Sequence, residues 1–92
     1  MKLDLYTIAC EYDGGNYVSQ IRAIDHKNAL IEWAALLRSE QPIEGASSQI
    51  AQEVDDGWAD PAPITGLIGV WCWSATIGHT PALVKLIRSA QP

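Results

Sequence analysis

A chain of 92 residues, of which 48% are apolar, has room for one modest core, and residues 1–92 are therefore predicted to form a single domain. The formal net charge of −5 and the lack of a basic patch argue against direct nucleic-acid binding. No apolar run approaches the roughly 20 residues of a membrane span, so we expect a soluble protein that does not bind a membrane.

The short apolar segment before Glu11 differs from a secretion signal, because Asp4 interrupts it. We therefore expect a cytoplasmic protein whose cysteines stay reduced. Cys10 and Cys72 both lie in predicted strands and are expected to be buried thiols. A disulfide between them is the less favoured alternative.

Residues 3–23 are predicted to form a β-hairpin, because two β-prone runs flank the Gly-rich segment 13–16. A turn centred on Gly14-Gly15 sets Tyr12 opposite Tyr17, and a turn at Asp13-Gly14 shifts the partners. Either turn gathers even-numbered residues of the first strand and odd-numbered residues of the second on one mostly apolar face.

A helix is predicted to begin after Asp25, which is a good N-cap residue, and to end before Pro42. Apolar residues then follow at the spacing of a helix that buries one stripe. This stripe contains Leu30, Trp33, Ala34 and Leu37.

A second, short helix is predicted within residues 40–57, with Ser47 or Ser48 as its cap and Gly57 as its end. Residues 60–63 contain two prolines and are expected to be an irregular connection. The apolar residues with helical spacing in the second helix region are Ile43, Ala46, Ile50 and Val54.

Residues 67–77 are predicted to form a strand with no polar face, because both alternating sets of side chains are largely apolar. Such a strand needs a cover on each side, which a helix or another protein chain would supply. Residues 78–81 are expected to turn the chain. Residues 82–89 fit either a strand paired with the Trp-rich strand or a helix capped by Thr80, and we favour the strand.

Together these elements predict an α+β fold in the order ββααββ. We expect a four-stranded, mainly antiparallel sheet with the helices packed on one face.

The charged residues are segregated along the chain, because Ser39 to Val84 contains no Lys or Arg. Such a one-signed stretch would attract a basic protein surface. Trp58 lies within this stretch and is a candidate interface anchor. The alternatives are a solvated acidic surface and a Trp58 that closes the core. The predicted partner-binding residues are Glu40, Glu44, Glu53, Asp55, Asp56, Trp58 and Asp60.

The sequence lacks the spacing of a metal site, because Cys10, Cys72, His26 and His79 are scattered along the chain. Both cysteines lie in apolar strands, unlike catalytic thiols, which are exposed and close to positive charge. No glycine pattern fits a phosphate-binding loop. We therefore expect no catalytic residue, no cofactor and no metal.

Two resemblances carry a functional expectation. The hairpin Asp13-Gly14-Gly15-Asn16-Tyr17-Val18 and the helix segment Asn28-Ala29-Leu30 resemble the opening of HicB-type antitoxins. Together with Trp33-Ala34 and residues 70–75, the pattern is also similar in general type to small bacterial immunity proteins that act beside polymorphic toxins. These resemblances imply an antitoxin or immunity protein.

The expected function is thus a non-enzymatic protein-binding module that occludes a basic surface of a toxin domain. The alternative function is a small-ligand or regulatory domain with a pocket lined by Trp33, Trp71 and Trp73. A homo-oligomer, in which a second copy covers the Trp-rich strand, is a further possibility.

Overall fold

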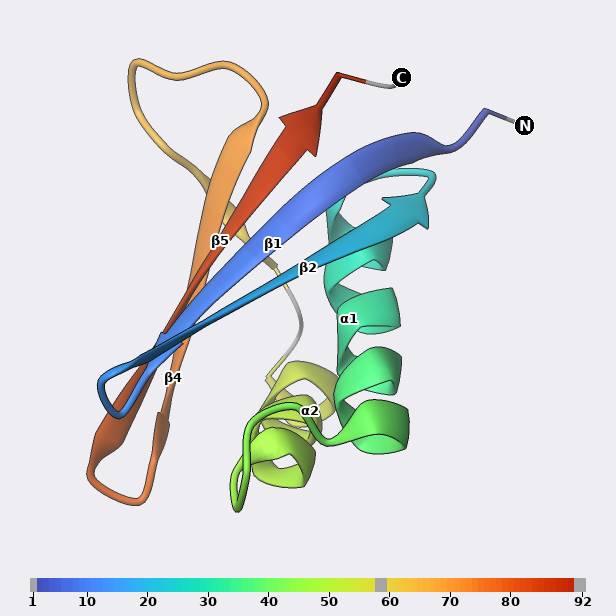
Figure 1. Cartoon of the computed structure of the whole chain (residues 1–92). Coiled ribbons are helices and arrows are strands. Elements are labelled where there is room, and N and C mark those ends of the chain that lie inside the picture. The colour runs from blue at the N-terminus through green and yellow to red at the C-terminus, as the bar shows by residue number, and fades with distance from the viewer. Residues whose placement is uncertain (1, 58–59, 91–92) are drawn as a thin grey trace.

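Two helices cover one face of a five-stranded antiparallel sheet (Figure 1). The computed structural model describes residues 2–57 and 60–90. The strand order is β2-β1-β5-β4-β3, so the α+β class is confirmed, but the sheet has five strands where four were predicted. The elements are β1 (Asp4–Tyr12), β2 (Gly15–Ala23), α1 (His26–Glu40), α2 (Ser47–Asp56), β3 (Ala62–Pro63), β4 (Val70–Ile77) and β5 (Thr80–Ser89).

The hairpin of β1 and β2 turns at Asp13-Gly14, so the register centred on Gly14-Gly15 is wrong and the alternative register is right. Tyr12 pairs with Gly15. Asp13 and Gly14 have φ values of 47° and 80°, the combination that a two-residue type I′ turn requires. The predicted division into two faces is confirmed, since the residues packed on the core are Tyr6, Ile8 and Cys10 of β1 with Tyr17 and Ile21 of β2.

Helix α1 begins as predicted at the N-cap Asp25, whose Oδ1 atom accepts a hydrogen bond of 2.8 Å from the backbone N–H of Asn28. The helix ends where Gln41 adopts the left-handed conformation with φ 50°. The predicted stripe Leu30, Trp33, Ala34 and Leu37 is buried, together with Ala29.

Helix α2 is held to the core by the predicted apolar residues, since Ile43, Ala46, Ile50 and Val54 are all buried. The predicted serine cap is wrong, because the N-cap is Ala46 and it makes no side-chain capping bond. The buried Ser47 hydroxyl instead accepts from the Ile43 N–H at 2.8 Å and donates to the Ile43 carbonyl at 3.0 Å. Gly57 is the C-cap, as predicted.

The C-terminal half of the chain differs from expectation in two places. Ala62 and Pro63 form the short edge strand β3 on β4, where an irregular connection was predicted. Proline is tolerated there because an edge strand leaves one side of its backbone unpaired. Strand β4 begins at Val70, three residues later than Leu67. The predicted strand at 82–89 is confirmed as β5, which lies between β1 and β4 and pairs with both.

The two cysteines lie on opposite faces of the sheet. Cys10 is 1% exposed in the core, and burial raises the pKa of its thiol to about 11. Cys72 is exposed on the face away from the helices, so the prediction of two buried thiols is wrong for Cys72. The alternation of side chains along β4 explains this, because Trp71 and Trp73 take the helix side.

Substitution of Asp25 is expected to show how much the N-cap of α1 contributes to the free energy of unfolding. The hydrogen bond from the Asn28 backbone N–H, with a second from its side chain, lowers the pKa of Asp25. Asp25→Ala should lower the free energy of unfolding at pH 7 by about 1 kcal/mol, measured by denaturant titration, whereas Asp25→Asn keeps an acceptor and loses less.

Because the folded-state pKa of Asp25 is depressed, its carboxylate stabilises the fold at neutral pH. This contribution should disappear as the pH falls below about 4, so the wild type should lose stability relative to Asp25→Asn in that range. Parallel stability curves for the two proteins between pH 6 and pH 3 would contradict this assignment.

Removal of the Ser47 hydroxyl is expected to leave the buried Ile43 N–H without an acceptor. Ser47→Ala should therefore lower the free energy of unfolding by roughly 1–3 kcal/mol. Ser48→Ala is the matched control, because the Ser48 hydroxyl is exposed and accepts from the Gln41 side chain, and it should change stability by less than about 0.5 kcal/mol. Equal losses in the two variants would argue against a structural role for the Ser47 hydroxyl.

Candidate functional site

The predicted acidic residues that the structure describes are exposed and lie on three successive parts of the chain. Glu40 ends α1 and Glu44 lies in the connection to α2. Asp60 follows α2 and precedes β3. The residues on α2 itself are Glu53, Asp55 and Asp56. Trp58 lies outside the described residues.

Two of these carboxylates form ion pairs with cations of α1. The Arg38 guanidinium donates a hydrogen bond to Asp55. The Lys27 ammonium lies 3.6 Å from the Asp60 carboxylate. Both pairs are exposed, so each contributes at most about 1 kcal/mol to stability. Each ion pair also changes the local charge, because the sequence suggests an unpaired carboxylate at a place where the structure has a neutral pair.

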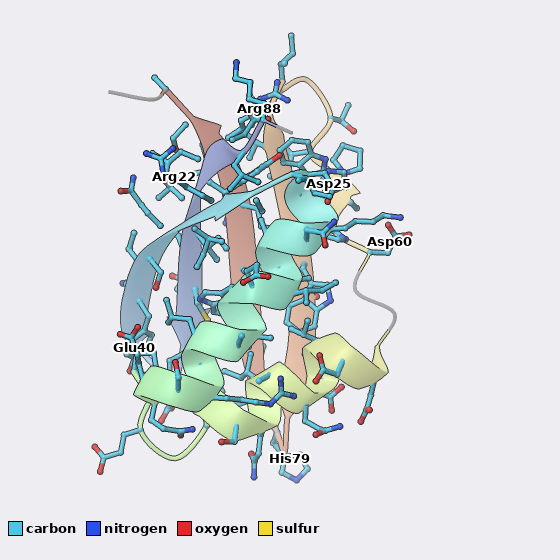
Figure 2. The ribbon with its side chains drawn as sticks, turned by 90° about the vertical axis from the view of Figure 1, so that its right-hand side faces the viewer. Arg22, Asp25, Glu40, Asp60, His79 and Arg88 are labelled. Atoms are coloured by element: carbon cyan, nitrogen blue, oxygen red, sulfur yellow. The ribbon has the colours of Figure 1, made fainter. Side chains whose placement is uncertain are left out.

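The acidic residues do not form one continuous surface. Glu40 and Asp60 lie toward opposite ends of α1 (Figure 2), because Asp60 contacts Lys27 in the first turn of that helix. A helix rises about 1.5 Å per residue, so residues 27 and 40 are separated by roughly 20 Å along its axis. A partner bound at α2 therefore has no necessary contact with Asp60.

Helix α2 presents the most concentrated acidic surface among the described residues. Small and aliphatic residues form its buried side, and its outer side carries polar residues. The helix contains no Lys or Arg. The Gln52 amide donates to Asp56 Oδ1 at 2.9 Å, which restrains that carboxylate. We call this the α2 surface, and its exposed residues are Ser48, Gln49, Gln52, Glu53, Asp55 and Asp56.

The three described tryptophans belong to the layer between the sheet and the helices. Trp33 is 1% exposed in the core, and Trp71 and Trp73 pack against the same cluster. The Trp71 indole also lies 6.1 Å from the Tyr6 ring, measured between centroids. These side chains therefore fill the core that the alternative function would need as a ligand pocket.

Sequence reasoning missed a second polar region, at the end of the molecule opposite the α2 surface (Figure 2). The His26 and Trp71 rings stack at 4.4 Å between centroids and 6° between planes. The Arg88 guanidinium lies over the same indole at 5.9 Å. No local pattern reveals these contacts, because 45 positions separate His26 from Trp71 and 17 separate Trp71 from Arg88.

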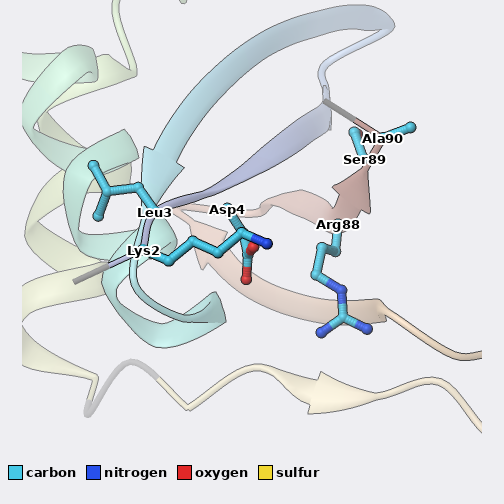
Figure 3. Close-up of a pocket in the computed structure, with 6 residues that line it drawn as sticks. All are labelled: Lys2, Leu3, Asp4, Arg88, Ser89 and Ala90. Carbon is cyan, nitrogen blue, oxygen red and sulfur yellow. The ribbon is translucent and has the colours of Figure 1, made fainter. Parts of the chain in front are cut away.

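An open groove of about 610 Å³ adjoins this region (Figure 3). Lys2, Asp4 and Arg88 provide its charged groups. The Asp4 carboxylate lies between two cations, so the groove has mixed charge and lacks the one-signed field that favours an anion or a cation. Its remaining lining residues are Leu3, Ser89 and Ala90.

Neither a metal centre nor a membrane-spanning helix is found within residues 2–57 and 60–90. These residues bring together no group of three or more His, Cys, Asp or Glu side chains suited to hold a metal ion. None of their helices is long and apolar enough to cross a bilayer. Comparison of the chain with family models, with curated proteins and with solved structures found no match.

Proposed function

We propose that this chain is a non-enzymatic protein-binding module that neutralises a toxin, as an immunity protein or an antitoxin. Its α2 surface docks on a basic surface of the toxin and occludes it. The observation that carries the proposal is the acidic outer side of α2, which contains no Lys or Arg and is anchored on the core by buried residues. Complementary charge of this kind raises association rates and selects against acidic partners.

The surroundings of α2 support this location. Glu40 and Glu44 lie at the same end of α1 as the start of α2, and both are exposed. They extend the negative field beyond the helix, while Arg38 neutralises only Asp55. Asp60 belongs to the other end of α1, so we restrict the docking surface to the end that carries α2.

The mechanism is steric and electrostatic. A toxin that acts on nucleic acid needs a basic surface to hold the phosphate backbone. A carboxylate-bearing helix covers such a surface by replacing phosphate groups with carboxylates. Because α2 is anchored by the buried residues Ile50 and Val54, little ordering is needed when the complex forms.

The test uses the product of the neighbouring reading frame as the partner. Co-expression with this chain should restore growth to cells that express that product. The double variant Glu53→Lys/Asp56→Lys should abolish protection, and it should slow association on the order of 10-fold or more at low salt, measured by surface plasmon resonance.

The matched control is Glu32→Lys/Asp60→Lys. Each reversal adds two charges, so either pair changes the net charge from −5 to −1. The residues of the control are exposed, Glu32 in the first half of α1 and Asp60 beside Lys27 in the first turn of that helix. Equal loss of protection in both double variants would show that net charge alone matters, and unchanged affinity in the α2 variant would refute the proposed surface.

A further inference from the structure

The face of the sheet turned away from the helices carries three exposed large apolar side chains among polar ones and has no cover among the described residues (Figure 1). Val18 is 67% exposed on this face, Leu83 is 45% exposed and Ile87 is 37% exposed. Antiparallel sheets with one solvated face normally place polar residues there. We call it the open sheet face, and its apolar side chains are Leu5, Ala9, Val18, Val70, Leu83 and Ile87.

The strand register places these side chains in neighbouring rows. Ala9 pairs with Val18 on one side and with Lys85 on the other, and Lys85 pairs in turn with Cys72. In the next row toward the end of the sheet, Leu83 lies between Glu11 and Ser74. Apolar side chains thus occur on all four strands, interleaved with polar ones. The exposed Val18, Leu83 and Ile87 are the groups among them that a partner would cover.

We propose that the open sheet face binds a second copy of this chain, forming a two-fold symmetric dimer. This proposal is independent of the toxin-binding function, because the α2 surface lies on the other side of the sheet (Figure 1). Three observations favour a second copy as the occupant: the relief of the face, its charges and its area.

The relief of the face is self-complementary. Leu83 projects between two hollows. One has a volume of about 210 Å³ and is lined by Ala9, Glu11 and Lys85 in addition to Leu83. The other, of about 410 Å³, is lined in part by Cys72 and Lys85. A protruding side chain beside a hollow is what a two-fold interface needs, because each Leu83 then fills a hollow of the other copy.

The charges of the face also suit a second copy. Glu11 and Lys85 are exposed on it, and among the described residues neither forms an ion pair. They border the same hollow, and in the proposed dimer, with its two-fold axis near Leu83, Glu11 of each copy pairs with Lys85 of the other. Two molecules with a net charge of −5 repel, and this face carries cations to offset its carboxylate.

The area is sufficient for a dimer. Strands of nine residues are about 30 Å long and four of them span about 19 Å, which gives a flat footprint of nearly 600 Å². Protruding side chains increase this area toward the roughly 800 Å² per partner of a standard interface. We therefore expect reversible association with a dissociation constant on the order of micromolar rather than a permanent dimer.

Sedimentation of the wild-type chain between 5 and 500 µM should show the mass rising from 10.0 kDa toward twice that value. Cys72 supplies a native reporter, because its exposed thiol lines one of the hollows that the second copy fills. Its reaction with a thiol reagent should slow at least about 10-fold as the dimer forms, while the buried Cys10 stays silent.

Leu83→Asp should give a monomer at every concentration, with Cys72 reacting at the rapid rate of the dilute wild type. Ile31→Asp is the matched control, because Ile31 is 48% exposed on α1 and should leave the dimer intact. Glu11→Lys should weaken the dimer, and adding Lys85→Glu to it should restore association. Circular dichroism establishes that each variant is folded.

Three results would overturn the proposal. The first is a mass of 10.0 kDa for the wild type at 500 µM. The second is a dimer in which Cys72 stays fully reactive, as expected if the chains pair through the edge of β2. The third is equal disruption by Leu83→Asp and Ile31→Asp.

Discussion

The one-sided packing of two helices on the sheet is the constraint on which the rest of this structure depends. The described residues form one core, centred on Trp33 and on the inward side chains of β1 and β5. Both helices are needed to cover these residues, so both lie on the same face. The remaining side chains of each strand then point to the opposite face, where polar and apolar side chains alike are exposed to solvent. An exposed Val18 is therefore a direct consequence of burying Tyr17.

Much of the fold follows from local patterns in the sequence. Asp25 and the stripe through Trp33 predict α1 correctly, because capping and helical periodicity act within a few residues. The alternation in β1 and β2 predicts the inward face for the same reason. The register of this hairpin could not be predicted as firmly, because Gly14 and Gly15 are both suited to a tight turn. The left-handed conformation of Asp13 decides it, and aspartate is tolerated there more readily than most residues.

What the sequence could not reveal depends on contacts between distant residues. Strand order requires knowledge of which edges meet, and β5 inserts beside β1 rather than extending the sheet beyond β4. Cys72 was expected to be buried because it lies in an apolar run, and the run alone does not show which of its side chains point toward the helices. The acidic stretch appears continuous for a similar reason. In space Lys27 binds Asp60 and Arg38 binds Asp55, so charge that is segregated along the chain is only partly segregated on the surface.

The central pairing of β1 with β5 also affects how the chain is made. Leu5 and Ser89 are partners although 84 positions separate them, so the middle of the sheet closes only after the chain has been synthesised as far as β5. Until then, the edge of β1 that later pairs with β5 remains unpaired. Contacts of such long sequence separation slow folding, and open strand edges invite aggregation. On the ribosome, β1 therefore remains without its β5 neighbour until residue 89 has been synthesised.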